Sequence, residues 1–186
     1  MRQEDVIRVL NEPLSQELLR SAIPARVAYT GTDGFPRAVP IGFHWDGRRI
    51  FVCTPPNAYK VRALEKNPKV ALTIDTNAHP PHILLVRGTV SIDIVDGVPS
   101  EYLEGARKLV PEQQFQAFES EVRSLYKQMA RIAITPEWAK LLDFETTIPS
   151  AVEELAMRRE SERSGSSPQG SQRPAWARAE VLWTGR

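Results

Sequence analysis

The segment of residues 25–54 reads ARVAYTGTDGFPRAVPIGFHWDGRRIFVCT. It holds three runs rich in β-branched and aromatic residues, separated by Asp33-Gly34 and Asp46-Gly47. Asp-Gly supplies the positive φ angles that tight hairpin turns require, so the stretch predicts an antiparallel meander of three strands. The predicted strands are residues 25–31, 35–45 and 48–54.

The pattern on either side of this stretch adds helices and further strands. Residues 14–22 fit a short amphipathic helix, and Ala58 to Lys66 a second one that ends at Asn67-Pro68. Six or seven antiparallel strands with few helices predict a mainly β barrel, and not the alternating pattern of a parallel α/β sheet. The remaining expected elements are strands 70–75, 82–95, 131–135 and 139–145, a helical insertion over 99–129, and a short helix over 149–158.

The composition bounds the class of protein. The chain has 186 residues, 41% hydrophobic and 25% charged, as is typical of a globular protein. No apolar run reaches the ~20 residues of a membrane span, the start resembles no signal peptide, and Cys53 is the single cysteine, so we expect a cytoplasmic protein without a membrane partner. Residues 1–157 are expected to form one domain and residues 158–186 a disordered tail rich in Ser, Gly, Pro and Arg.

The charge distribution argues against a nucleic-acid partner. The tail from Arg158 onward holds six arginines and three glutamates, out of 24 basic and 23 acidic residues in the whole chain. Residues 1–157 are therefore nearly neutral in net charge and have no basic stripe.

The segment CTPPNAYKVRALEKNP, residues 53–68, is the best candidate for chemistry. Thr54 ends a predicted strand, and Lys60 lies in the first turn of the helix that follows. Free N–H groups and the positive end of the helix dipole meet there, so the segment predicts an anion site. The alternative is that Lys60 and Arg62 are solvated residues on an exposed helix.

Other candidate sites carry weaker signals. His79 and His82 could share a metal, but no Asp, Glu or Cys stands at ligand spacing beside them, so no metal site is expected. Cys53 lies in a strand without a base partner, which is typical of a small buried residue. No Gly-x-Ser-x-Gly elbow is present, and no dinucleotide or P-loop motif occurs.

Residues 36–75, PRAVPIGFHWDGRRIFVCTPPNAYKVRALEKNPKVALTID, resemble the flavin-binding core of the pyridoxamine 5'-phosphate oxidase-like family of split β-barrel flavoproteins. VRGTVSI at 86–92 and ITPEWAKLLDF at 134–144 match the same family. The resemblance covers about residues 14–150. It implies a six- to seven-stranded antiparallel split β-barrel of the flavin-reductase type.

The resemblance also implies a cofactor site. Arg37 to Ile41 would run along the ring and ribityl chain of a flavin, with backbone contacts from Val39, Pro40 and Ile41. A second group would hold the phosphate. Its members are Thr54, Ala58, Tyr59 and Lys60.

One departure from the family pattern concerns the phosphate. Members that bind FMN firmly often have Ser-Arg-Lys where this chain has Ala58, Tyr59 and Lys60, so an arginine that could clamp a phosphate is missing. Arg62 or Arg37 would then compensate, or the site would bind FMN more weakly, or it would suit the deazaflavin coenzyme F420 or haem instead of FMN.

The function implied by the resemblance is a flavin- or deazaflavin-dependent oxidoreductase that transfers a hydride to or from a small organic substrate. The family forms homodimers with the cofactor at the subunit interface, and residues 142–144 would reach the cofactor of the partner subunit. His44, Tyr59 and Asp75 are candidates for acid–base work by position alone. The alternatives are a flavin- or haem-binding protein without turnover, and a barrel that serves only as a dimerisation module.

Overall fold

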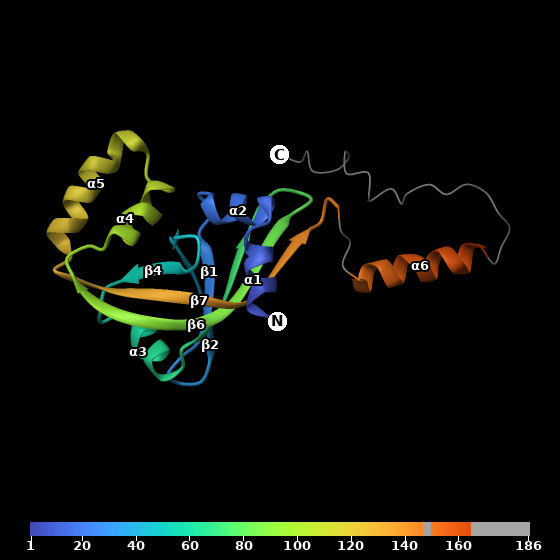
Figure 1. Cartoon of the computed structure of the whole chain (residues 1–186), viewed down its shortest axis with the longest axis horizontal. Coiled ribbons are helices and arrows are strands. Elements are labelled where there is room, and N and C mark those ends of the chain that lie inside the picture. Colours follow the sequence, from blue (N-terminus) through green and yellow to red (C-terminus); the bar gives the residue numbers. More distant parts are fainter. Residues whose placement is uncertain (147–149, 165–186) are drawn as a thin grey trace, which may run out of the picture. The chain divides into compact units, whose positions relative to one another are not determined.

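A computed structural model describes residues 1–146 and 150–164 of the chain (Figure 1). These residues form a seven-stranded antiparallel sheet and six helices. The helices are α1 (Gln3–Leu10), α2 (Pro13–Arg20), α3 (Tyr59–Lys66), α4 (Ser100–Arg107), α5 (Glu112–Leu125) and α6 (Ser150–Ser164). The strands are β1 (Ala25–Thr30), β2 (Pro36–Ile41), β3 (His44–Trp45), β4 (Ile50–Thr54), β5 (Lys69–Asp75), β6 (His82–Asp96) and β7 (Gln128–Asp143).

The strand order β2-β1-β5-β6-β7-β4-β3 confirms the mainly β fold. β2 and β3 occupy the two edges of the sheet, yet only Gly42 and Phe43 separate them along the chain. The sheet must therefore curl until its edges approach each other. Because β2 and β3 do not pair in the described residues, the barrel stays split rather than closed.

The two Asp-Gly hairpins are confirmed, but the meander is wrong in its middle. Gly34 (φ 83°) and Gly47 (φ 96°) turn β1 into β2 and β3 into β4. The predicted strand 35–45 breaks at Gly42 and Phe43, and β4 pairs with β7 instead of β2. Phe43 is buried in the core at this break, so the chain passes from one edge of the sheet to the other.

The C-terminal half of the sheet also differs from expectation. β7 is one strand through the buried Pro136, where two strands were expected. The register of β4 with β7 ends at Ile50 and Ile134, so β7 has already passed the end of β4 at Pro136, and proline is tolerated where a ladder partner is missing. The expected helix over 99–129 is two helices separated at Pro111, and Met129 belongs to β7.

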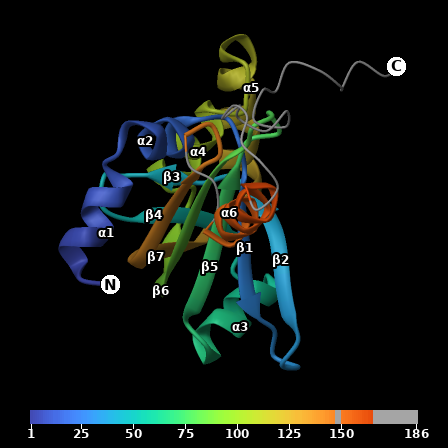
Figure 2. The ribbon, with the colours of Figure 1, turned by 90° about the vertical axis from the view of Figure 1, so that its right-hand side faces the viewer.

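The core lies inside the curled sheet, with helices on both sides. α3 lies below the strands and α2, α4 and α5 above them in both views (Figures 1 and 2). α4 approaches β3 closely, because a Cβ built on Gly105 would lie 3.0 Å from the carbonyl carbon of Phe43. Lys108 Nζ, just beyond α4, donates to the Leu19 carbonyl oxygen at 3.2 Å and so ties α4 to α2.

The chain divides into two compact units. The first comprises residues 1–76 and 83–141 and contains the sheet core; the second comprises residues 77–82 and the chain from Leu142 onward. In the second unit α6 continues to Ser164, beyond the expected end at Arg158 and into the segment expected to be disordered. Residues 165–186 of the predicted tail lie outside the described residues.

None of the helices in residues 1–146 and 150–164 is long and apolar enough to cross a membrane.

Candidate functional site

Thr54 and Lys60 lie next to each other at the junction of β4 and α3. Thr54 is the last residue of β4 and only 5% exposed, and Lys60 Nζ lies 3.4 Å from Thr54 Oγ1. The turn between them closes when the Ala58 amide donates to the Pro55 carbonyl oxygen at 3.1 Å. A hydroxyl and an ammonium thus share one side of a tight turn, which we call the β4–α3 cradle (Thr54 to Lys60).

The start of α3 adds uncompensated positive charge to this cradle. No side chain caps the helix at Ala58, and no acidic residue lies in its first turn. Uncapped N–H groups carry the positive end of the helix dipole, so they favour an anion in front of them. The cradle therefore offers a charge, a hydroxyl and backbone donors to one anionic group, the combination that phosphate sites use.

The stem of Lys60 connects the cradle to β2. Lys60 lines a cavity of about 10 Å³ inside the curled sheet, together with Val39 and Ile41. These two β2 residues are half-buried, whereas the neighbouring Ala38 and Pro40 are exposed. The strand expected to carry the flavin ring and the residue expected to hold the phosphate therefore meet inside the same part of the fold.

Arg37 is engaged elsewhere. Its two guanidinium nitrogens Nη1 and Nη2 donate to Asp33 Oδ1 and Oδ2, both at 2.9 Å. The hydrogen bond from Arg37 lowers the pKa of Asp33 to about 2, so the carboxylate stays ionised at any physiological pH. Arg37 would have to leave this pair before it could compensate for the missing arginine of the cradle.

Tyr59 and Arg62 form the outer face of the α3 start. Tyr59 is 78% exposed, and the guanidinium carbon of Arg62 lies 5.2 Å from the centre of its ring. Arg62 is exposed as well. The position where the family resemblance leads one to expect an arginine thus holds an aromatic ring that faces outward.

The candidates for acid–base work lie on three different elements. His44 in β3 is half-buried and its ring centre lies 6.4 Å from that of Phe51. Asp75 at the end of β5 forms an ion pair with Arg26 of β1. Tyr59 is the only one of the three in the cradle, so the structure does not assemble them into a common site.

A second pocket, which the sequence did not reveal, lies between the sheet and the helical insertion. It has a volume of about 260 Å³ and begins at Ile41, the last residue of β2. Its one carboxylate, Glu101, lies 3.3 Å from Arg131 Nη1 and so is neutralised. No local pattern could predict this pocket, since its walls come from distant segments. They include Gly42, Phe51, Cys53, Tyr102, Gly105, Leu109 and Phe118.

Cys53 behaves as a buried apolar residue. It is 9% exposed on β4 and packs in a cluster with residues of α4 and α5. Burial, with a smaller contribution from the charge of Glu101, raises the pKa of the Cys53 thiol to about 12. Because the thiolate is the reactive form, the group is a poor nucleophile at neutral pH.

We expect Cys53 to resist alkylation in the folded chain. With a pKa of about 12, roughly one thiol in ten thousand is ionised at pH 8. Iodoacetamide should leave the native protein unmodified over an interval in which the urea-unfolded chain reacts completely, as intact-mass spectrometry would show. Equal rates for the native and the unfolded chain would contradict the burial of this thiol.

In the second unit, two carboxylates that are distant along the chain lie beside His82. His82 Nε2 is 3.4 Å from Asp143 Oδ1 and 3.8 Å from Glu145 Oε2. The amide of Phe144 also donates to the Pro81 carbonyl oxygen at 3.4 Å. The sequence shows no acid at ligand spacing beside this histidine, and the fold brings Asp143 and Glu145 to it from a distant segment of the chain.

Comparison with known proteins agrees with this architecture. A family model described as pyridoxamine 5'-phosphate oxidase matches residues 12–144. No curated protein matches the chain significantly. A solved structure described as an F420 reductase is 25% identical with a TM-score of 0.53, covering 67% of this chain and 94% of that one.

Two further solved structures share the fold at lower identity. HutZ, described as a heme storage protein from Vibrio cholerae, is 18% identical with a TM-score of 0.51 over 70% of this chain and 92% of its own. General Stress Protein 26 from Bacillus anthracis is 16% identical with a TM-score of 0.50 over 69% and 90%. The family model covers every strand of the sheet and both helices of the insertion. The chain belongs to the pyridoxamine 5'-phosphate oxidase-like family.

Proposed function

We propose that this protein is a flavin- or deazaflavin-dependent oxidoreductase that transfers a hydride to or from a small organic substrate. The observation that carries the proposal is the β4–α3 cradle, where Lys60 Nζ lies 3.4 Å from Thr54 Oγ1 at the uncapped start of α3. Both cofactors carry a phosphate at the end of a ribityl chain. The donors of the cradle fit such a group.

The charge of the cradle favours a phosphodiester over a phosphomonoester. Lys60 is its one cation, and Tyr59 stands where a second would be expected. FMN ends in a monoester with up to two negative charges, whereas the phosphate of coenzyme F420 is a diester with one. The likeness to a protein described as an F420 reductase, at 25% identity, supports the deazaflavin as the first cofactor to test.

The residues of the chain would bind and orient the cofactor. Thr54, Lys60 and the amide of Tyr59 would hold the phosphate, because the Ala58 amide already donates to the Pro55 carbonyl oxygen. The backbone of Val39, Pro40 and Ile41 would lie along the ring. The bound ring supplies the hydride chemistry, while the protein contributes position and electrostatics.

The substrate would enter the pocket of about 260 Å³ that begins at Ile41. Its walls are mostly apolar, and Arg131 neutralises its one carboxylate, Glu101. A small uncharged molecule with an apolar body suits such a site better than a phosphorylated one. The geometry thus does not favour pyridoxamine 5'-phosphate as the substrate.

The second candidate function is binding of a flavin or of haem without turnover. The likeness to a heme storage protein, at 18% identity, shows the fold alone. The two functions differ in whether an organic acceptor reoxidises the bound reduced cofactor faster than oxygen does.

The deciding experiment has two stages. An absorption spectrum of the purified protein, followed by titration with FMN, F420 and haemin, would identify the cofactor. The reduced complex would then be mixed anaerobically with a set of apolar quinones and enones. Reoxidation at a rate that saturates with acceptor supports the oxidoreductase. A chain that binds neither flavin would remove the proposal, and a Soret band would favour haem.

We expect a homodimer in solution. If the family's arrangement holds here, residues 142–144 of one subunit reach the cofactor of the other, and the cofactor pocket is incomplete in a monomer. Light scattering coupled to gel filtration should give about twice the mass of 20.9 kDa at micromolar concentration. A mass of one chain, with cofactor bound, would contradict the shared site.

A further inference from the structure

We propose that a groove between α1, the β3–β4 hairpin and β7 is a second binding site, for a small organic anion with a planar apolar body. We call it the arginine pocket. It goes beyond the proposed oxidoreductase function, because none of its lining residues belongs to the β4–α3 cradle. It is lined by Gln3, Ile7, Leu10, Asn11, Trp45, Asp46, Gly47, Arg48, Arg49, Thr135 and Pro136.

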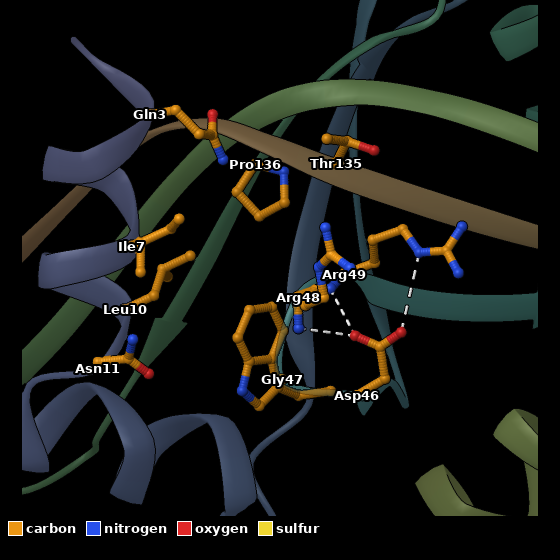
Figure 3. Close-up of a pocket in the computed structure, with 11 residues that line it drawn as sticks. Gln3, Ile7, Leu10, Asn11, Asp46, Gly47, Arg48, Arg49, Thr135 and Pro136 are labelled. Carbon is orange, nitrogen blue, oxygen red and sulfur yellow. Dashed lines mark hydrogen bonds and ion pairs between the residues drawn. The ribbon is translucent and has the colours of Figure 1, made fainter.

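The dimensions of the arginine pocket match those of a ligand site. Its volume is about 660 Å³, within the range of roughly 300–1,000 Å³ that small-molecule sites occupy. Figure 3 shows Gln3, Ile7 and Leu10 of α1 on one side and the hairpin residues Asp46 to Arg49 on the other. A planar molecule can therefore insert between the helix and the hairpin.

The sheet explains why the pocket exists. The register of β4 with β7 ends at the pair Ile50 and Ile134. β7 continues through Thr135 and Pro136 without β4 beside it, and these two residues line the groove. The chain turns between β3 and β4 at residues 46–49, so β4 does not extend along this part of β7 and α1 borders the space instead.

The charge of the pocket selects an anion. Asp46 Oδ1 accepts hydrogen bonds from the backbone amides of Arg48, at 2.7 Å, and Arg49, at 2.6 Å, and these bonds fix the hairpin turn. Its other oxygen lies 3.8 Å from Arg49 Nε. Arg48 is exposed, and among residues 1–146 and 150–164 no carboxylate forms an ion pair with it. With two guanidinium groups and one carboxylate, the lining is net positive, and Arg48 is available to bind a carboxylate or phosphate bidentately.

The remaining walls select an apolar body. Trp45 is half-buried, and Leu10 and Pro136 are buried beneath the groove. Ile7 leaves 50% of its surface exposed at the rim, so apolar surface is open to a ligand there. An aromatic ring that carries an acid group would cover this surface and reach Arg48 at once.

The arginine pocket and the cradle lie at opposite ends of one buried strand. β4 starts at Ile50, next to Arg49, and ends at Thr54, and all five of its residues are buried. At about 3.3 Å per residue, the two ends are roughly 13 Å apart. A ligand in the arginine pocket therefore leaves the cofactor phosphate site free, and the two should bind independently.

The test is calorimetric titration of the full-length protein with 2-naphthoate, with neutral 2-naphthamide as the matched probe. Arg48→Gln removes the available guanidinium, and Arg20→Gln, at the exposed end of α2, makes the same charge change elsewhere. We expect naphthoate to bind at sub-millimolar concentration and Arg48→Gln to weaken it at least tenfold. Arg20→Gln should change its affinity less than twofold, and naphthamide should bind at least tenfold more weakly.

A second variant keeps the proposal independent of Arg48. Ile7→Glu places a carboxylate at the exposed rim, where it should repel naphthoate and leave folding intact because half of the residue's surface is already exposed. The proposal is overturned if naphthoate does not bind at millimolar concentration, if Arg48→Gln and Arg20→Gln have equal effects, or if naphthamide binds as well. Competition between naphthoate and the flavin would place the probe in the cofactor site and overturn it too. If neither FMN nor F420 binds, that result affects the proposed function alone and leaves the arginine pocket unaffected.

Discussion

Lys60→Ala is expected to weaken binding of the flavin or deazaflavin about ten- to a hundredfold. Lys60 supplies the one cation of the β4–α3 cradle, with Nζ 3.4 Å from Thr54 Oγ1. A charge-assisted hydrogen bond to phosphate contributes about 1.5–3 kcal/mol, which corresponds to that change in affinity. Quenching of cofactor fluorescence in a titration would measure it.

Two further variants separate the cradle from a general charge effect. Lys66→Ala removes the same charge at the exposed C-terminal end of α3 and should change the affinity less than twofold. Thr54→Val keeps the buried shape but removes the hydroxyl, so it should cost about 1 kcal/mol, roughly fivefold in affinity. Wild-type affinity in Lys60→Ala would mean that the phosphate does not bind at the start of α3.

Gly88→Ala is expected to lower the free energy of unfolding by about 2–4 kcal/mol and the melting temperature by roughly 5–15 °C. Gly88 is buried in β6 and pairs with Val70 of β5. A Cβ at this position would fall 2.9 Å from the carbonyl carbon of Thr135 and closer still to its oxygen. The obstacle is backbone rather than a flexible side chain, so β6 and β7 would have to separate.

Gly42→Ala is the matched control for this substitution. A Cβ on Gly42 meets only the Leu109 side chain, at 3.1 Å, and that side chain can move aside. Circular dichroism melts of both variants should show a loss for Gly88→Ala several times larger than for Gly42→Ala. Similar melting temperatures for Gly88→Ala and the unaltered protein would show that the two strands do not cross at this glycine.

The Lys60 and Gly88 variants test two different contributions to cofactor binding, a direct contact and the packing of the sheet. Gly88 allows β6 to approach β7 closely, and the folded sheet places Val39 and Ile41 of β2 in the same cavity as Lys60. A loss of stability in Gly88→Ala should therefore be accompanied by weaker cofactor binding, whereas Lys60→Ala should weaken binding without a change in melting temperature. The comparison separates a structural cause from a direct contact.

Local sequence was sufficient for the features whose parts are close along the chain. The Asp-Gly pairs gave both hairpin turns, because Gly34 and Gly47 adopt the positive φ that those turns require. The cradle was equally accessible, since Thr54 and Lys60 are separated by one turn and the start of a helix. The resemblance to the split-barrel family added the expectation of a cofactor, which no pattern of single residues could supply.

Features that join distant segments needed the tertiary structure. The sequence could not show that β4 pairs with β7, because strand pairing depends on which partners remain after the whole sheet has curled. It also missed the meeting of His82 with Asp143, the pocket between the sheet and α4–α5, and the arginine pocket. The order of turns and strands follows from neighbouring residues, because backbone preferences act locally. The sites between elements arise from packing, which brings together side chains that share no local pattern.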